Sequence, residues 1–304
     1  MKPLAALAPL SPPLRVLVFL VGLALLWLPL ALPLYWLAAT GRLDLGGAIA
    51  TGLLYVGFLV LWPTWAKRVH QISQPWATLG WVWRPGLAVD WLLGIALGLG
   101  GIAALGAIEL ALGWASGQPA SASLLRILVE GALVGLAVGL AEELLFRGWL
   151  LFELEQGFSA GKALVGTALV FAAAHFIKPL PDILATLPQF FGLFLLGLTL
   201  GWARRSPSHG QALEPSSKQH ADQALKQDSR QPSSSPRRTA LGYPMGLHGG
   251  LVWGYYLISV GQVVQLTGAV PEWVTGLEGN PLSGVLGLLL LGALAALFYR
   301  SAHD

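Results

Sequence analysis

The chain has 304 residues, of which 55% are hydrophobic and only 11% charged, and its mean hydropathy is +0.66. Several apolar runs reach the ~20 residues that a helix needs to cross a bilayer; they are continuous rather than alternating, which excludes a soluble fold and a transmembrane β-barrel. The formal net charge of +3 gives no reason to expect a nucleic-acid partner, and the lack of cysteine excludes disulfides, thiolate catalysis and Cys-ligated zinc.

The sequence predicts an all-α polytopic membrane protein, a single membrane domain over residues 1–304 with about eight transmembrane helices. In chain order, the predicted spans are 15–39, 45–65, 87–114, 124–155, 159–176, 183–203, 243–266 and 282–299. With a cytoplasmic N-terminus, 14 of the 18 Lys and Arg residues fall on the inner side and three on the outer side, while Arg147 lies within a span. The positive-inside rule therefore predicts that both termini are cytoplasmic.

Residues 206–239, between spans six and seven, differ in composition from the rest of the chain. They are rich in Ser, Gln, Pro and charge, with almost no large apolar side chains. Such a segment cannot bury a core, so we expect a disordered cytoplasmic loop, either a flexible linker or a partner-binding segment.

The fourth span carries two adjacent carboxylates, Glu142 and Glu143, inside an apolar run. Hydrocarbon disfavours each ionised side chain at a helix centre by ~2.5–3.5 kcal/mol, so the pair needs a reason to be there. Glu142 has no basic residue three or four positions away on either side. An unpaired carboxylate in a low-dielectric site can take up and release a proton, which favours Glu142 as general base or acid.

Glu143 continues a face of small residues at intervals of four, and Arg147 follows it. That face, Gly131, Gly135 and Gly139, would let another helix approach closely. The i,i+4 spacing of Glu143 and Arg147 permits an ion pair within the helix, so we interpret Glu143 as a neutralised structural charge.

Two histidines also lie in hydrophobic stretches. The turn at residues 156–161 folds the fourth and fifth spans against each other, which would place His175 at nearly the same depth as Glu142. His248 begins the seventh span, among Gly246, Gly249 and Gly250, where a substrate backbone could approach the imidazole. His248 is only about ten residues past Arg238, which favours a position nearer to the cytoplasm than Glu142, but the over-long fourth span could extend into the cytoplasm and reduce this difference.

The motif series Glu142-Glu143-x-x-x-Arg147, Phe171-x-x-x-His175 and His248, in that order on three predicted helices, resembles the CPBP family of membrane proteins. That family groups CAAX prenyl-protease-like enzymes with bacteriocin-processing and self-immunity proteins. Within the catalytic motif region 124–259, the likeness covers about residues 130–259. It implies an eight-helix intramembrane endopeptidase whose site opens to the cytosol, in which Glu142 and His175 activate the attacking water and His248 helps to stabilise the oxyanion.

One position departs from the family pattern. Members commonly carry Asn four residues after the third-motif histidine, and this chain has Val252 there. A single oxyanion-hole donor can be worth ~2.7–4 kcal/mol, so its loss weakens the expected site. Tyr255, seven residues after His248 on the same helical face, is the candidate replacement donor.

The residues do not settle whether a metal takes part. Glu142, His175 and His248 are the ligand types of a catalytic zinc site, but a Glu–His pair can activate water alone, and we favour the metal-free mechanism, with no cofactor required. The expected partners are the lipid bilayer and a membrane-anchored or lipidated protein or peptide substrate.

Other functions remain open at this stage. The same carboxylates and imidazoles would serve a proton-coupled transporter, and a non-enzymatic membrane partner or immunity protein could share the fold. We expect an integral protein of the bacterial plasma membrane, with a photosynthetic internal membrane as the alternative.

Overall fold

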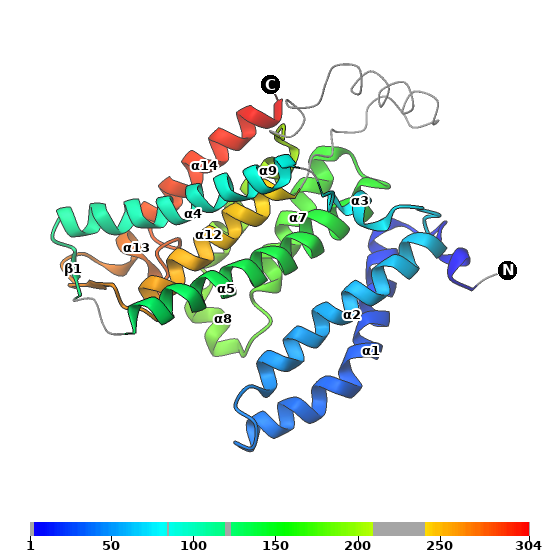
Figure 1. Ribbon diagram of the computed structural model, residues 1–304, viewed down its shortest axis with the longest axis horizontal. Helices are drawn as coiled ribbons and strands as arrows, with labels where there is room; N and C mark the ends of the chain where they lie inside the picture. The colour runs from blue at the N-terminus through cyan, green and yellow to red at the C-terminus, as the bar shows by residue number, and fades with distance from the viewer. Residues whose placement is uncertain (1–2, 84, 119–122, 209–240, 304) are drawn as a thin grey trace. The chain divides into compact units, whose positions relative to one another are not determined.

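The computed structural model describes residues 3–83, 85–118, 123–208 and 241–303. The described chain is nearly all helix, as predicted, with two strands of three residues each (Figure 1). Residue contacts divide the chain into two compact units. One consists of Met1–Trp81 and Phe152–Phe158, and the other of Val82–Leu151 and Ser159–Asp304.

The first unit is built on a pair of long apolar helices. Its elements are the 3₁₀ turn η1 (Pro3–Leu7), α1 (Pro12–Ala39), α2 (Gly46–Arg68) and the short α3 (Pro75–Leu79), joined by residues 152–158. Phe19 of α1 is fully buried and meets the rings of Phe58 and Trp65 of α2 edge-on, with ring centroids 6.0 and 5.3 Å away. These aromatic contacts hold α1 against α2.

A buried carboxylate with both oxygens in hydrogen bonds, that of Glu153, lies inside this unit. The Glu153 side chain is fully buried, and its Oε2 accepts a hydrogen bond from Arg15 Nε at 3.0 Å. Its Oε1 accepts from Trp65 Nε1 and lies against His70 Nε2, both at 2.7 Å. A buried charge is tolerated when it is paired and hydrogen-bonded in this way.

The second unit contains the remaining helices and the strand pair. Its elements are α4 (Pro85–Ala111), β1 (Ala115–Gly117), α5 (Leu124–Glu143), the π-helical η2 (Leu144–Leu150), the start of α6 (Leu151–Glu155), α7 (Ala160–Ala174), α8 (Leu180–Thr186), α9 (Gln189–Arg205), α12 (Gly242–Ser259), β2 (Val264–Leu266), α13 (Glu272–Thr275), η3 (Leu277–Gly279) and α14 (Val285–His303). Strands β1 and β2 pair antiparallel, with Ser116 opposite Gln265.

Helix α12 is the centre of this unit, between α4 and α5. On the α5 side, a Cβ on Gly139 would lie 2.6 Å from Met245 O, and one on Gly249 would lie 2.9 Å from Gly135 O. On the α4 side, a Cβ on Gly94 would lie 2.6 Å from Leu247 N. The glycine face predicted on the fourth span is therefore confirmed as a helix contact, and its partner is α12.

The glycines around His248 have a different role from the one expected. Backbone atoms of α4 lie against Gly246 and Gly250, and those of α5 lie against Gly249. The expectation that these glycines leave room for a substrate backbone is wrong, because neighbouring helices fill the space.

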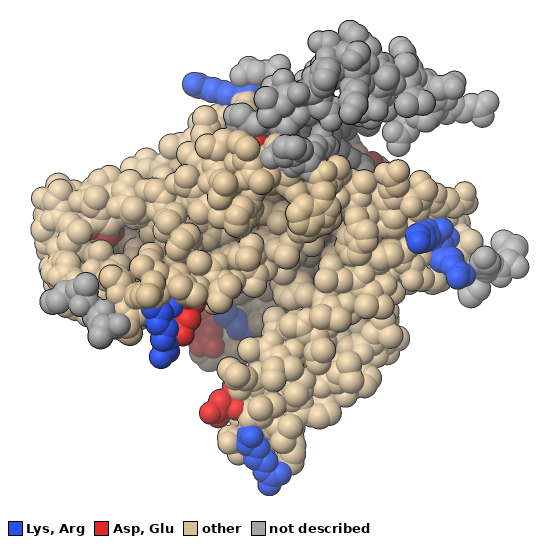
Figure 2. Space-filling model, in the orientation of Figure 1, with Lys and Arg blue, Asp and Glu red and all other residues tan. Residues whose placement is uncertain are grey.

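Five described helices are long and apolar enough to cross a membrane, and a sixth is added if the bent pair α8 and α9 counts as one span. These five are α1, α2, α4 from Gly86, the continuous helix Leu124–Glu155, and α14. The predicted count of eight is not confirmed. Figure 2 shows uncharged residues over most of the visible face, as contact with a bilayer requires.

Two predicted spans differ from the observed elements. The span predicted at 183–203 is not one continuous helix, because α8 and α9 are bent by 74° relative to each other. Pro188 lies between them, and proline both lacks the N–H for a helical hydrogen bond and restricts the preceding residue. The span predicted at 243–266 ends as a helix at Ser259, and residues 264–266 form β2 instead. The loop predicted at 206–239 lies outside the described residues except for 206–208.

Close packing on α12 at only one of two nearby glycines of α4 predicts that alanine substitutions at the two positions affect stability differently. We expect Gly94→Ala to lower the melting temperature in detergent, because overpacking a helix contact costs ~1–3 kcal/mol. Gly100→Ala, on the same helix, meets nothing within 4 Å and should leave stability unchanged or raise it, since alanine is the better helix former. Tryptophan-fluorescence melting curves would measure both variants. Equal melting temperatures would contradict the packing of α4 on α12.

Candidate active site

The buried Glu143 carboxylate holds the candidate site together. Its side chain is 0% exposed, and its Oε1 accepts a hydrogen bond from Arg147 NH1 at 2.8 Å. The same oxygen lies 2.8 Å from Nδ1 of His248 on α12. The ion pair permitted by the i,i+4 spacing is therefore present, but Glu143 also connects α5 to the third-motif histidine, which the sequence did not indicate.

Arg147 has further contacts that its position in the sequence does not indicate. Its NH2 donates to the carbonyl oxygen of Gly197 on α9 at 3.1 Å, and its guanidinium carbon lies 4.3 Å from the centre of the Phe171 ring. The guanidinium thus joins α9 and α7 to the site through a hydrogen bond and a cation–π contact. No local pattern in the sequence marks a backbone carbonyl 50 residues away as its partner.

A π-helical segment starts directly after Glu143. Residues 144–150 form η2, between α5 and α6, and Arg147 lies within it. A π turn inserts one extra residue into a helix and shifts the side chains that follow it around the axis; such turns are frequent at functional sites. The side chains after Glu143 are thus displaced from the face that a regular helix would give them.

Glu142 and Glu143 each have one buried oxygen, Oε2, without a hydrogen-bond partner among the described residues, and that of Glu142 faces His248 Nε2. The Glu142 side chain is 20% exposed, and its Oε2 lies 3.9 Å from His248 Nε2, too far for a hydrogen bond. His248 is therefore placed between the two carboxylates.

Phe171 lies between the two candidate histidines. Its ring is fully buried, with centroids 4.8 Å from the His175 ring and 5.9 Å from the His248 ring. Phe146 meets it edge-on at 5.1 Å. Phe171, the phenylalanine of the second motif, therefore contacts both imidazole rings and lies against the Arg147 guanidinium.

His175 caps the C-terminal end of α7 and is exposed. Its Nδ1 lies 2.8 Å from the Phe171 carbonyl oxygen, which can only accept, so Nδ1 is the donor and neutral His175 carries its free lone pair on Nε2. His175 forms no ion pair with Glu142. Its ring contacts Phe171, and the Phe171 ring in turn contacts His248.

The remaining residues to be placed are two on α12 and three acids in predicted spans. Val252 and Tyr255 are half-buried on α12. Of the remaining membrane acids, Glu130 is paired with Arg126 at 2.7 Å and Asp90 accepts a hydrogen bond from Ser208, while Glu109 is buried. These three acids lie outside the Glu142–Glu143–His248 cluster.

The described residues offer no ready-made metal site. No group of three or more His, Asp or Glu side chains among them is arranged to hold an ion. Glu142, His175 and His248 therefore do not fit a zinc ligand set as they stand.

The comparison with family models gives one match. Residues 124–210 match the model described as Rce1-like, type II CAAX prenyl endopeptidase Rce1-like. The matched segment contains Glu142, Glu143, Arg147 and His175, which bears out the resemblance over that region; His248 follows it. Comparisons with curated proteins and with solved structures gave no match.

Removing one partner of the buried Glu143–Arg147 ion pair should lower stability strongly, and replacing the second partner as well should restore part of it. Arg147→Leu leaves the Glu143 carboxylate with too few donors, and we expect it to cost ~3–5 kcal/mol. Adding Glu143→Gln should recover part of that loss. Arg126→Leu, which breaks an exposed i,i+4 pair, should cost ~0–1 kcal/mol. Melting curves in detergent would compare the three variants, and a wild-type melting temperature for Arg147→Leu would contradict the structural role.

Proposed function

We propose, on the premise that residues 124–210 are an Rce1-like domain, that this chain is an intramembrane endopeptidase that hydrolyses a peptide bond with a water activated by Glu142. At family level the domain is that of a CAAX-type membrane protease, and the several apolar helices are those of an integral membrane protein. The observation that carries the proposal is the position of His248, with Nδ1 on Glu143 and Nε2 3.9 Å from Glu142 Oε2.

The free oxygen of Glu142 supports its assignment as the base. A water within hydrogen-bonding distance, ~2.8 Å, of Oε2 would also be within reach of the imidazole Nε2. In the proposed reaction, Glu142 takes a proton from this water while the water oxygen forms a bond to the peptide carbonyl carbon. The C–N bond then breaks, and Glu142 returns the proton to the leaving nitrogen, so that a carboxylic acid and an amine result; transfer of the acid proton to the amine then gives carboxylate and ammonium.

The charges around His248 support its role towards the oxyanion. Glu142, Glu143 and Arg147 together carry one net negative charge, so a protonated His248 makes the cluster neutral. Because Nδ1 is engaged by Glu143, the proton on Nε2 is the one that His248 can donate to the carbonyl oxygen as negative charge develops. Tyr255 is the proposed second donor, in place of the amide absent at Val252.

His175 is proposed as the partner of Glu142 in moving the water proton, as the resemblance implies. The hydrogen bond to the Phe171 carbonyl fixes the ring and leaves Nε2 as the acceptor. The reaction uses protein groups alone, and added zinc should not be needed.

The proposed substrate is a membrane-bound protein or peptide with a lipidated end, and the family description favours a prenylated CAAX sequence. Such a chain would reach the site from the bilayer. A bacterial plasma membrane is the proposed location.

Replacing the proposed base should remove activity and leave the fold intact. Purified Glu142→Gln should cleave a farnesylated CAAX peptide at least 10²-fold more slowly than wild type, since a positioned base contributes ~10²–10⁴-fold. Glu130→Gln, a carboxylate outside the site, is the matched control and should cleave normally. Wild-type cleavage by Glu142→Gln would refute the mechanism. Glu142-dependent ion flux in proteoliposomes without any hydrolysis would favour a transporter.

Glu143 should act through His248 and not on the substrate. We expect Glu143→Gln to lower kcat more than it changes KM, because it loosens the imidazole that acts in the transition state. His248→Ala should lower kcat further, and the double variant should be no slower than His248→Ala alone, since the two residues work as a unit. Additive losses in this double-mutant cycle would show that Glu143 has an independent role.

A further inference from the structure

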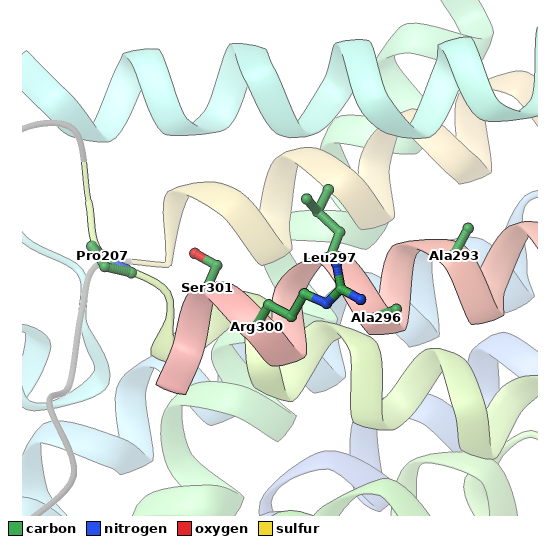
Figure 3. A pocket seen from close by; sticks show the side chains of 6 residues that line it. All are labelled: Pro207, Ala293, Ala296, Leu297, Arg300 and Ser301. Carbon is green, nitrogen blue, oxygen red and sulfur yellow. The ribbon is translucent and has the colours of Figure 1, made fainter. Parts of the chain in front are cut away.

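A cavity of about 490 Å³ lies along the C-terminal part of α14, and none of its lining residues belongs to the candidate active site. Figure 3 shows its lining: Pro207, which follows α9, and Ala293, Ala296, Leu297, Arg300 and Ser301 of α14. Its volume falls within the ~300–1,000 Å³ range of small-molecule pockets. We refer to it as the α14 cavity.

The five α14 residues form a single helical stripe, ordered by polarity. Their positions follow the i, i+3, i+4, i+7, i+8 pattern of one helix face. The apolar Ala293, Ala296 and Leu297 come first, and Arg300 and Ser301 follow in the final turns of a helix that is apolar enough to cross a membrane. The cavity lining is therefore apolar along the earlier part of the stripe and includes a cationic residue in the last turns of α14, where a membrane-spanning helix would reach the membrane boundary.

Arg300 has no partner within the described residues. It forms no hydrogen bond or ion pair there, and no carboxylate lines the cavity. In Figure 3 its side chain runs back over the α14 stripe towards Leu297 and Ala296. A basic residue in a last turn also complements the helix dipole, but that role requires neither a cavity nor an adjacent hydroxyl. A guanidinium that pairs with no carboxylate suits a phosphate group, and the Ser301 hydroxyl lines the same cavity.

We propose that the α14 cavity binds an anionic phospholipid, with its phosphate at Arg300 and Ser301 and the start of an acyl chain against Ala293, Ala296 and Leu297. A lipid fits better than a free phosphate because the larger part of the lining is apolar. The site is separate from the proposed peptidase chemistry, so neither inference depends on the other. Its binding would anchor α14 at the membrane boundary, where anionic headgroups concentrate.

Native mass spectrometry of the full-length protein, titrated with phosphatidylglycerol, tests the proposal. We expect Arg300→Ala to weaken phosphatidylglycerol binding about tenfold, the value of one strong charge-assisted contact. Ala296→Trp, which fills the apolar part of the cavity from an exposed position, should weaken it similarly. Phosphatidylcholine with the same acyl chains should bind more weakly than phosphatidylglycerol to the wild type and be less sensitive to Arg300→Ala.

The control removes a positive charge elsewhere. Lys162 is exposed on α7, outside the cavity, and Lys162→Ala should bind phosphatidylglycerol as the wild type does. Circular dichroism would establish that each variant is folded. An equal loss in Lys162→Ala and Arg300→Ala would overturn the proposal, since the attraction would then be non-specific. Full displacement of phosphatidylglycerol by sodium phosphate would overturn the lipid assignment, because the apolar wall would contribute nothing.

Discussion

A single buried carboxylate oxygen, Glu143 Oε1, receives both Arg147 and His248, and the arrangement of the site depends on it. A carboxylate with no exposed surface is strongly disfavoured unless donors replace its lost water, and those donors come from two different helices. The same interaction that neutralises Glu143 therefore fixes the distance between α5 and α12. It also orients the imidazole, so that Nε2, and not Nδ1, faces Glu142. Helix packing and the arrangement of the candidate site therefore depend on one hydrogen-bond network.

Two carboxylates on the continuous helix Leu124–Glu155 show how environment separates a structural role from a reactive one. Glu153 has both oxygens engaged, by Arg15, Trp65 and His70, and nothing remains for a substrate or a water. Glu142 has an oxygen without a partner among the described residues, beside an imidazole. A carboxylate whose oxygens already accept hydrogen bonds is stabilised in its ionised form, whereas an oxygen without a donor is available to accept a proton. This contrast supports the proposal that Glu142, and not Glu153, is the base, and the position of Glu142 Oε2 beside His248 Nε2 distinguishes it from Glu143, whose Oε2 also lacks a partner.

Glycine packing connects the architecture to the site. Helix α12 contacts the backbones of α4 and α5 directly, because side chains are absent from both contact faces. The small separation from α5 brings His248 within reach of a short carboxylate side chain. The Phe171 ring lies edge-on to the imidazole, with ring centroids 5.9 Å apart, and the Arg147 guanidinium lies over the Phe171 ring. The family match ends at residue 210, so it is the helix contact that joins α12 to the matched segment.

The sequence by itself determined the membrane class, the nearly all-helical fold, the glycine face of the fourth span and the Glu143–Arg147 spacing, because hydropathy and helical periodicity are local properties. It also singled out Glu142, His175 and His248, since charged and imidazole groups stand out in apolar runs. It did not determine the bend at Pro188, the π segment after Glu143, or the strand at 264–266. Only the tertiary structure decided that α12 is the helix on the glycine face, that Glu143 is shared with His248, and that Gly197 receives Arg147. The two hydrogen bonds join residues 50 and 105 positions apart, and their partners, like those of the glycine face, are set by how the helices pack, which no local pattern encodes.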